Sequence, residues 1–337
     1  MINNNKKIRL KDIADAVGCS VSTVSIVLNG KYKERSISEQ VVTQILNTAK
    51  KYGYMPNMSA RYMRSGQYNM NISLMTSFEA PLVLINAWLI SIEKFIEQVS
   101  VENMSFTITL TPFHVGHLEK VFSVKDIEAA IIANTNATDD EFLEEASLSM
   151  PIVLINRRIS DYCTVRLDES AAIEAADVLI SQHRKKIAVL KPPFLTQSTK
   201  ERFDNFTHRV IESGLPRPDV IELEQYNEYG AHLALQAYFK TGGTFDGLFT
   251  MTDVLAVGAY KAIKSTGRKI PDDVAVIGFD GLSYAPYLDP PLTTFEVKRG
   301  FVYSEAVRIL VQMIMNDFRQ HVEITYKTKL VKRGSIG

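Results

Sequence analysis

The N-terminal fifty residues carry apolar positions at the spacing of three short amphipathic helices. The first stripe follows the i, i+3, i+4, i+7 pattern and consists of Leu10, Ile13, Ala14 and Val17. Gly18 ends that helix, and Ser20 can cap a second helix over residues 21–28. Ser36 or Ser38 can cap a third helix, whose stripe consists of Val42, Ile45, Leu46 and Ala49. The pattern predicts a three-helix domain at this end of the chain.

From residue 70 onward the hydrophobic pattern switches repeatedly between the period of a strand and that of a helix. Candidate strands cover residues 72–76, 106–110, 130–133, 152–155, 164–167, 187–190, 220–223, 247–250 and 274–277. Candidate helices between them include residues 87–99, 171–181, 202–213, 231–239 and 254–265. Such alternation is typical of parallel sheets with helices on both faces. Roughly 265 residues exceed what one sheet usually needs, so we expect two α/β subdomains.

The distribution of charge separates the two regions. The chain of 337 residues has 38 basic and 38 acidic residues and a net charge of zero. Residues 1–70 hold 11 of the Lys and Arg but only 4 of the Asp and Glu, which leaves 27 against 34 for the remainder. A basic head on an acidic body is expected where only the head meets a polyanion. A basic tail without any partner would show the same imbalance.

Several protein classes lack support in the sequence. No apolar run approaches the roughly 18 residues of a membrane span, and residues 1–7 are polar and unlike a secretory signal. Two cysteines, Cys19 and Cys163, cannot form a disulfide framework, so we expect a cytoplasmic protein. His114 and His117, three residues apart without cysteine or a carboxylate partner, are more typical of a surface loop than of a metal site. No phosphate-binding or catalytic motif is present, and we expect no enzyme activity, cofactor or metal.

The first two helices, joined by a turn that contains glycine, have the form of a helix-turn-helix. The second helix of that motif enters the DNA major groove. Its outward positions here are small or uncharged and are Ser22, Thr23, Ser25 and Ile26. Such a face suits close approach to base edges, whereas a solvent-facing helix usually carries Lys and Glu. A generic three-helix domain with a serine-rich surface is the alternative.

Longer motifs in this region resemble the head of the lactose-repressor (LacI/GalR) family. Residues 10–30 resemble its K-D-[VI]-A segment, A-G-V-S turn and T-V-S-R-[VL]-L-N-G helix. Residues 50–57 resemble its L-G-Y-x-P-N signature, and residues 60–64 resemble its A-R-x-L-R hinge helix. The resemblance implies a sequence-specific DNA-binding transcription regulator, and more specifically a repressor. It implies DNA contacts by Ser20, Val21, Ser22, Thr23, Ser25, Asn29, Ala60, Arg61, Met63 and Arg64.

The linker over residues 55–70 has two interpretations. In isolation it has too few apolar residues for a core and reads as flexible. The resemblance implies a helix that forms only on DNA, beside the same segment of a second subunit, with Met63 as a wedge in the minor groove. Four features depart from the family. Ile26 replaces a base-reading arginine, Arg9 replaces a threonine cap, Met63 replaces a leucine, and the turn at 31–36 is longer. Operator sequences of relatives therefore cannot be transferred to this chain.

The C-terminal region resembles the same family in five blocks, at residues 151–157, 202–206, 252–258, 270–280 and 290–294. The resemblance implies a periplasmic-binding-protein-like body whose two subdomains are joined by three crossovers and enclose a sugar-like effector. We expect effector contacts from Phe78, Arg157, Arg202, Thr252, Asp253 and Asp280. The last three follow strands, and ligands of open α/β sheets bind beyond the carboxyl ends of strands. Arginine and aspartate facing each other across a cleft can hold a sugar, although an ordinary ion pair is the alternative.

The expected domains are a helix-turn-helix head (1–56), a hinge (57–70) and an effector-binding and dimerisation body (71–337). Within the body we expect one subdomain at 71–163 plus 296–322 and another at 164–295 plus 323–337. The expected partners are double-stranded operator DNA, a sugar-like effector and a second copy of the chain, with no membrane. Two alternatives remain open. A protein corepressor could control the same head, or the chain could be a solute-binding protein of a transporter, which would need a signal peptide and no head.

Overall fold

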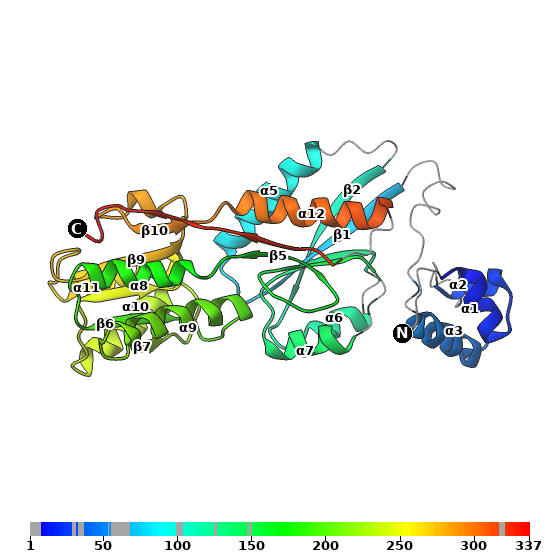
Figure 1. Cartoon of the computed structure of the whole chain (residues 1–337), viewed down its shortest axis with the longest axis horizontal. Coiled ribbons are helices and arrows are strands. Elements are labelled where there is room, and N and C mark those ends of the chain that lie inside the picture. The colour runs from blue at the N-terminus through cyan, green and yellow to red at the C-terminus, as the bar shows by residue number, and fades with distance from the viewer. Residues whose placement is uncertain are drawn as a thin grey trace.

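The structure is a computed structural model, in which an N-terminal helical head precedes an elongated α/β body (Figure 1). The described residues are 8–28, 32, 37–52, 54, 68–98, 104–124, 127–146, 148, 150–316 and 321–337. No helix among them is long and apolar enough to cross a membrane.

The head contains α1 (Leu10–Val17), α2 (Val21–Leu28) and α3 (Glu39–Lys51). The first two helices have the predicted bounds, and Ile13, Val24 and Ile45 are buried at their common core. Leu46 differs from its prediction, because it is exposed rather than part of the inner stripe. At the start of α1 the carboxylate of Asp12 accepts the backbone N–H of Arg9 at 2.7 Å. That contact satisfies one amino-terminal N–H where the family's threonine cap is missing.

The first sheet of the body has the order β11-β5-β4-β3-β1-β2, and all its neighbouring strands are parallel. Helices α5 and α12 pack on one face, and α6 and α7 lie on the other (Figure 1). The strands are β1 (Tyr68–Ser77), β2 (Met104–Phe113), β3 (Ala129–Ile132), β4 (Ile152–Ile155), β5 (Cys163–Leu167) and β11 (Glu323–Tyr326). The helices are α5 (Leu82–Gln98), α6 (Leu118–Val124), α7 (Ala137–Glu145) and α12 (Arg299–Asn316).

The second sheet has the order β12-β10-β9-β8-β6-β7 and is parallel except for β12. Helices α8 and α9 cover the face that carries Val189 and Phe249, and α10 and α11 cover the face of Leu190 and Leu248. The strands are β6 (Ile187–Lys191), β7 (Asp219–Glu222), β8 (Gly247–Thr250), β9 (Ala275–Asp280), β10 (Thr293–Glu296) and β12 (Lys329–Val331). The helices are α8 (Ala171–Ser181), α9 (Gln197–Glu212), α10 (Glu228–Lys240) and α11 (Asp253–Ser265).

The chain passes between the two sheets three times, after β5, after β10 and after β11. This agrees with the three crossovers that the resemblance implied. The expected subdomain bounds differ from the observed pairing at two strands. Both β5 and β11 pair within the first sheet, whereas the expected bounds assigned residues 164–167 and 323–326 to the second. The apolar residues of β5 are equally compatible with either sheet, so only the pairing decides.

Candidate functional site

The second helix of the head exposes part of the outward face that the sequence predicted: Ser22 is exposed, and Thr23, Ser25 and Ile26 are half-buried. Val21 and Ser22 are exposed at its start, whereas Val24 and Val27 are buried. Ser20 caps the helix, since its hydroxyl oxygen accepts the Thr23 N–H at 3.0 Å and lies 2.8 Å from the Thr23 hydroxyl. The other predicted contact in this helix is Ser25, which is half-buried. The predicted contacts Asn29, Ala60, Arg61, Met63 and Arg64 lie outside the described residues.

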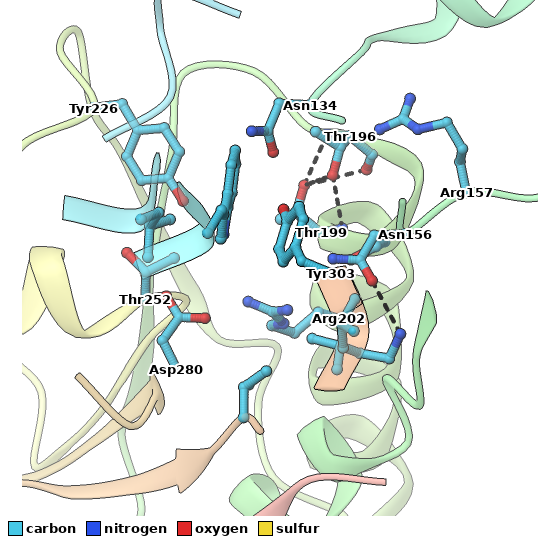
Figure 2. Close-up of a pocket in the computed structure, with 16 residues that line it drawn as sticks. Asn134, Asn156, Arg157, Thr196, Thr199, Arg202, Tyr226, Thr252, Asp280 and Tyr303 are labelled. Atoms are coloured by element: carbon cyan, nitrogen blue, oxygen red, sulfur yellow. Dashed lines mark hydrogen bonds between the residues drawn. The ribbon is translucent and has the colours of Figure 1, made fainter. Parts of the chain in front are cut away.

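A cavity lies between the two sheets of the body, where the carboxyl ends of the parallel strands meet (Figure 2). Its volume is about 70 Å³, several times the roughly 10–15 Å³ that one water molecule needs. The lining residues are Leu84, Trp88, Asn134, Asn156, Arg157, Leu167, Thr196, Ser198, Thr199, Arg202, Tyr226, Thr252, Asp280, Val297, Val302 and Tyr303. Both subdomains contribute to this lining, so a bound molecule would contact both.

Arg202 projects from α9 into the cavity and is almost completely buried. Its Nε and Nη2 donate to the Glu169 carboxylate at 2.7 and 3.0 Å, and its Nη1 donates to the Met251 carbonyl at 2.7 Å. The guanidinium also lies 3.5 Å from the ring centroid of Phe279. Burial opposes its charge, but Glu169 and then Asp280 raise the pKa of Arg202 above its usual value. Since a guanidinium has five N–H groups, two remain beyond these three bonds.

Asp280 ends β9, and its carboxylate and the Arg202 guanidinium point toward one another (Figure 2). Both residues belong to the second subdomain, so they do not face each other across the cleft as expected. The backbone of Asp280 has a φ of 119°. Residues other than glycine rarely adopt this conformation, and strained backbone of this kind is often found at functional sites. Gly281 continues the turn with a φ of 64°, and a Cβ there would lie 2.7 Å from the Glu296 Cα. Only glycine fits this position, and the turn fixes the carboxylate at the cavity.

Thr252 lies immediately before α11 and also lines the cavity. Its hydroxyl oxygen is buried and has no hydrogen-bond partner among the described residues. A buried hydroxyl without a partner destabilises the fold by about 1–3 kcal/mol, which a ligand could offset. Of the six predicted effector residues, Arg202, Thr252 and Asp280 therefore have side chains suited to the role.

The other three predicted residues have different surroundings. Arg157 lines the cavity and is almost completely buried. Its Nε donates to the Ile155 carbonyl at 3.2 Å and its Nη1 to Asp140 at 2.7 Å, whereas its Nη2 has no hydrogen-bond partner among the described residues. Asp253 is fully buried outside the lining, where it accepts the Leu282 N–H at 2.8 Å and the Thr294 hydroxyl at 2.6 Å.

Phe78 is 59% exposed and is absent from the lining of the cavity. Its ring centroid lies 4.9 Å from that of His114. The first of the two predicted surface histidines is thus a neighbour of Phe78, and its Nδ1 lies 3.1 Å from a Glu79 carboxylate oxygen. Within the described residues, no three His, Cys, Asp or Glu side chains are grouped to hold a metal ion.

The lining also contains residues that the sequence did not single out. Asn134 and Asn156 follow β3 and β4 with φ angles of 58° and 57°. Asn134 donates to the Thr76 hydroxyl at 2.9 Å, and the carbonyl oxygen of the Asn156 side chain accepts the Leu167 N–H at 3.0 Å. These bonds fix both amides at the edge of the first sheet. On the apolar side, the Trp88 and Tyr303 rings stack at 4.8 Å.

Two family models match separate parts of the chain. The model of bacterial regulatory proteins of the lacI family matches residues 9–57, and a periplasmic-binding-protein-like domain matches residues 176–336. A helix-turn-helix transcriptional regulator of Lachnoclostridium phytofermentans is 28% identical over 298 residues, which cover 85% of this chain and 86% of the relative. The ribose operon repressor of Haemophilus influenzae is 24% identical over 335 residues, which cover 97% of this chain and 98% of the relative.

Solved structures share the fold over most of the chain. The lac repressor dimer bound to operator and the anti-inducer ONPF has a TM-score of 0.69 at 18% identity and covers 98% of this chain and 99% of that one. A LacI family regulator of Enterococcus faecium with bound ribose has a TM-score of 0.66 at 18% identity and covers 78% of this chain and 98% of that one.

A helix-turn-helix head on a periplasmic-binding-protein-like body defines a DNA-binding transcription regulator that is controlled by an effector. The chain belongs to the LacI family. Members of this family are regulators without enzyme activity, so that prediction is confirmed. The match of the head excludes the alternative of a transporter solute-binding protein.

Proposed function

We propose that this chain represses transcription in the bacterial cytoplasm as a homodimer on a near-palindromic operator. In each subunit α2 reads the major groove through its exposed start, and residues 60–64 form a hinge helix on DNA with Met63 as the wedge. The exposed, uncharged pair of Val21 and Ser22 and the basic residues of the head support the DNA contact. The lac repressor, whose fold this chain shares, is bound to its operator as a dimer, which supports the assembly.

The effector in this proposal is a small sugar-like molecule in the cavity, and its binding changes operator affinity. The observation that carries the proposal is the cavity itself, where Arg202, Asp280 and the Thr252 hydroxyl meet between two subdomains. Groups of this kind form multidentate hydrogen bonds to adjacent hydroxyls. The name of the ribose operon repressor and the ribose bound to the Enterococcus faecium regulator agree with this class of ligand.

The DNA contact is tested by selecting an operator from random duplexes and measuring its affinity for the full-length protein. We expect selected sites with two-fold symmetry and a steep loss of affinity with salt. Six or more neutralised phosphates give a slope of log K against log salt of about −5 or steeper. Salt-insensitive binding, or selected sites without symmetry, would contradict the proposal.

A matched pair of variants tests which helix reads the bases. Ser22 on α2 and Ala16 on α1 are both exposed, so Ser22→Glu and Ala16→Glu add the same charge to the same domain. If α2 lies in the major groove, Ser22→Glu weakens operator binding at least tenfold more than Ala16→Glu. Equal losses would assign both effects to general repulsion by phosphates and would contradict the role of α2.

A thermal-shift screen of sugars, sugar phosphates and nucleobases tests the effector. We expect at least one compound to raise the melting temperature and to change operator affinity. If none does, while the operator contact holds, control by a protein corepressor becomes the better explanation.

A further inference from the structure

The composition of α2 limits the ways in which this helix can read DNA. Its eight residues, Val21–Leu28, comprise three serine or threonine residues and five aliphatic ones. The side chains that form two parallel hydrogen bonds to one base are arginine or lysine with guanine, and asparagine or glutamine with adenine. None of these four residue types occurs in α2. The helix therefore has no side chain for a bidentate contact with a base.

The outward side of α2 begins with an aliphatic side chain. Val24 and Val27 are buried in the core of the head, so the helix turns its opposite side to solvent. On that side Val21 is 44% exposed and Ser22 is exposed, and the half-buried Ile26 lies one turn after Ser22. A single exposed valine is ordinary on most protein surfaces. Val21, however, stands at the N-terminal end of the helix, which approaches the base edges in a helix-turn-helix.

The hydroxyl groups at this end of α2 discriminate little between bases. The Thr23 hydroxyl lies 2.8 Å from the Ser20 hydroxyl, whose oxygen also accepts the Thr23 N–H, so this pair caps the helix. Ser22 presents an exposed hydroxyl. A hydroxyl both donates and accepts, and it therefore pairs with more than one kind of base. Discrimination then depends on the aliphatic surface.

Thymine is the base that matches an aliphatic side chain in the major groove. Its edge carries a C5-methyl group, whereas cytosine presents an amino group and the purines present N7 beside an oxygen or an amino group. Contact with a valine would remove water from those polar groups without replacing their hydrogen bonds, which is unfavourable. Burying the thymine methyl group is favourable instead, and one such group changes affinity by about threefold to fourfold.

We propose that α2 selects thymine at the base pair that its N-terminal end faces, through contact between the thymine C5-methyl group and Val21. This inference rests on the proposed function, because it requires α2 to lie in the major groove. It adds the base that this helix prefers and the side chain that recognises it. Each half-site of the operator then carries an A·T pair opposite Val21.

The test removes single methyl groups from the DNA and measures affinity by fluorescence anisotropy. The probe is the operator selected from random duplexes with the full-length protein. Each thymine of one half-site and its symmetry mate are replaced together by deoxyuridine, which keeps the hydrogen-bonding groups and lacks only the methyl group. We expect one such pair of replacements to weaken binding by about tenfold, since each half-site loses about threefold to fourfold. At the same position 5-methylcytosine should bind more tightly than cytosine, because it restores the methyl group.

A matched pair of protein variants assigns this contact to a side chain. Val21 on α2 and Leu46 on α3 are each 44% exposed, so Val21→Ser and Leu46→Ser remove aliphatic groups of equal exposure from the same domain. Melting temperatures establish that both variants fold. We expect the effect of deoxyuridine to fall below threefold in Val21→Ser and to stay at about tenfold in Leu46→Ser.

The outcomes separate this inference from the proposed function. If no replacement by deoxyuridine weakens wild-type binding more than threefold, or if the tenfold effect persists in Val21→Ser, the inference is overturned. A symmetric, salt-sensitive operator would still support the proposed function in that case. If selection yields no symmetric operator, the proposed function fails, and the inference fails with it.

Discussion

Replacing Arg202 by alanine should destabilise the body as well as remove an effector contact. The variant loses two charge-assisted bonds to Glu169, at 2.7 and 3.0 Å, and one bond to the Met251 carbonyl. Glu169 lies two residues before α8, in the first of the three crossovers between the subdomains. Through its bonds to Glu169, Arg202 therefore links the cavity to one of the three segments that connect the subdomains.

The magnitude follows from the carboxylate that is left behind. Removing one partner of a buried ion pair typically destabilises by about 3–5 kcal/mol, because the other charge stays buried without compensation. Glu169 keeps the Ser198 hydroxyl at 2.6 Å, which favours the lower end of that range. At roughly 2–4 °C for each kcal/mol, the expected fall in melting temperature is about 6–12 °C at that end.

The assay is thermal denaturation followed by circular dichroism on matched variants. Arg209→Ala is the control, because Arg209 lies on the same helix and pairs with Asp177 at 2.6 Å in a half-exposed position. Such a pair contributes about 1 kcal/mol or less. Adding Glu169→Gln to Arg202→Ala should recover part of the loss, since a buried amide is less unfavourable than a buried charge. If Arg202→Ala melts within 2 °C of Arg209→Ala, or Glu169→Gln brings no recovery, the reasoning about the buried pair is wrong.

Three further predictions address other parts of the chain. Asp253→Ala should lower the free energy of unfolding by about 1–3 kcal/mol in urea denaturation, because it leaves the buried Leu282 N–H without its acceptor; unchanged stability would refute that role. Met63→Gly should weaken operator binding far more than binding to random DNA, with Met63→Gln as a variant of better helix propensity; equal losses on both DNAs would argue against the wedge. Burial raises the pKa of both the Cys19 and the Cys163 thiol, but only Cys163 is shut off from solvent, so iodoacetamide should modify the half-buried Cys19 first and Cys163 only after unfolding; equal rates in the native protein would contradict the burial.

The sequence predicts best the helices and strands that are defined by a local pattern of hydrophobic residues. Helices 10–17, 21–28 and 171–181 and strands 152–155 and 247–250 have the predicted bounds. No helix was predicted over α12, and no strand over β10, β11 or β12. The three strands have only three or four residues each and are defined by pairing with distant segments. Their place depends on the crossovers, which a local pattern does not contain.

The candidate site was predicted only in part, again because some of its contacts join segments that are far apart in the sequence. The rule that ligands bind at the carboxyl ends of strands correctly brought Thr252 and Asp280 to the cavity. Applied to the predicted strands 130–133 and 152–155, it would also have selected Asn134 and Asn156. The sequence could not show that Asp253 is saturated by internal hydrogen bonds or that the Arg157 guanidinium points toward Asp140. Those facts depend on side-chain contacts between distant segments.

The central claim, that a molecule in this cavity controls operator binding, is tested most directly by operator titrations of wild type and Asp280→Ala. Fluorescence anisotropy gives the operator affinity of each protein without and with the sugar that raises the wild-type melting temperature most in the thermal-shift screen. We expect the sugar to change the wild-type affinity at least tenfold. Without sugar Asp280→Ala should match wild type within twofold and should melt at a similar temperature. Losing a charged partner in a desolvated site weakens ligand binding by about 2–5 kcal/mol, roughly thirtyfold or more, so the variant should not respond at concentrations that saturate wild type. An Asp280→Ala protein that responds at wild-type concentrations would contradict the account, because the effector would then bind elsewhere.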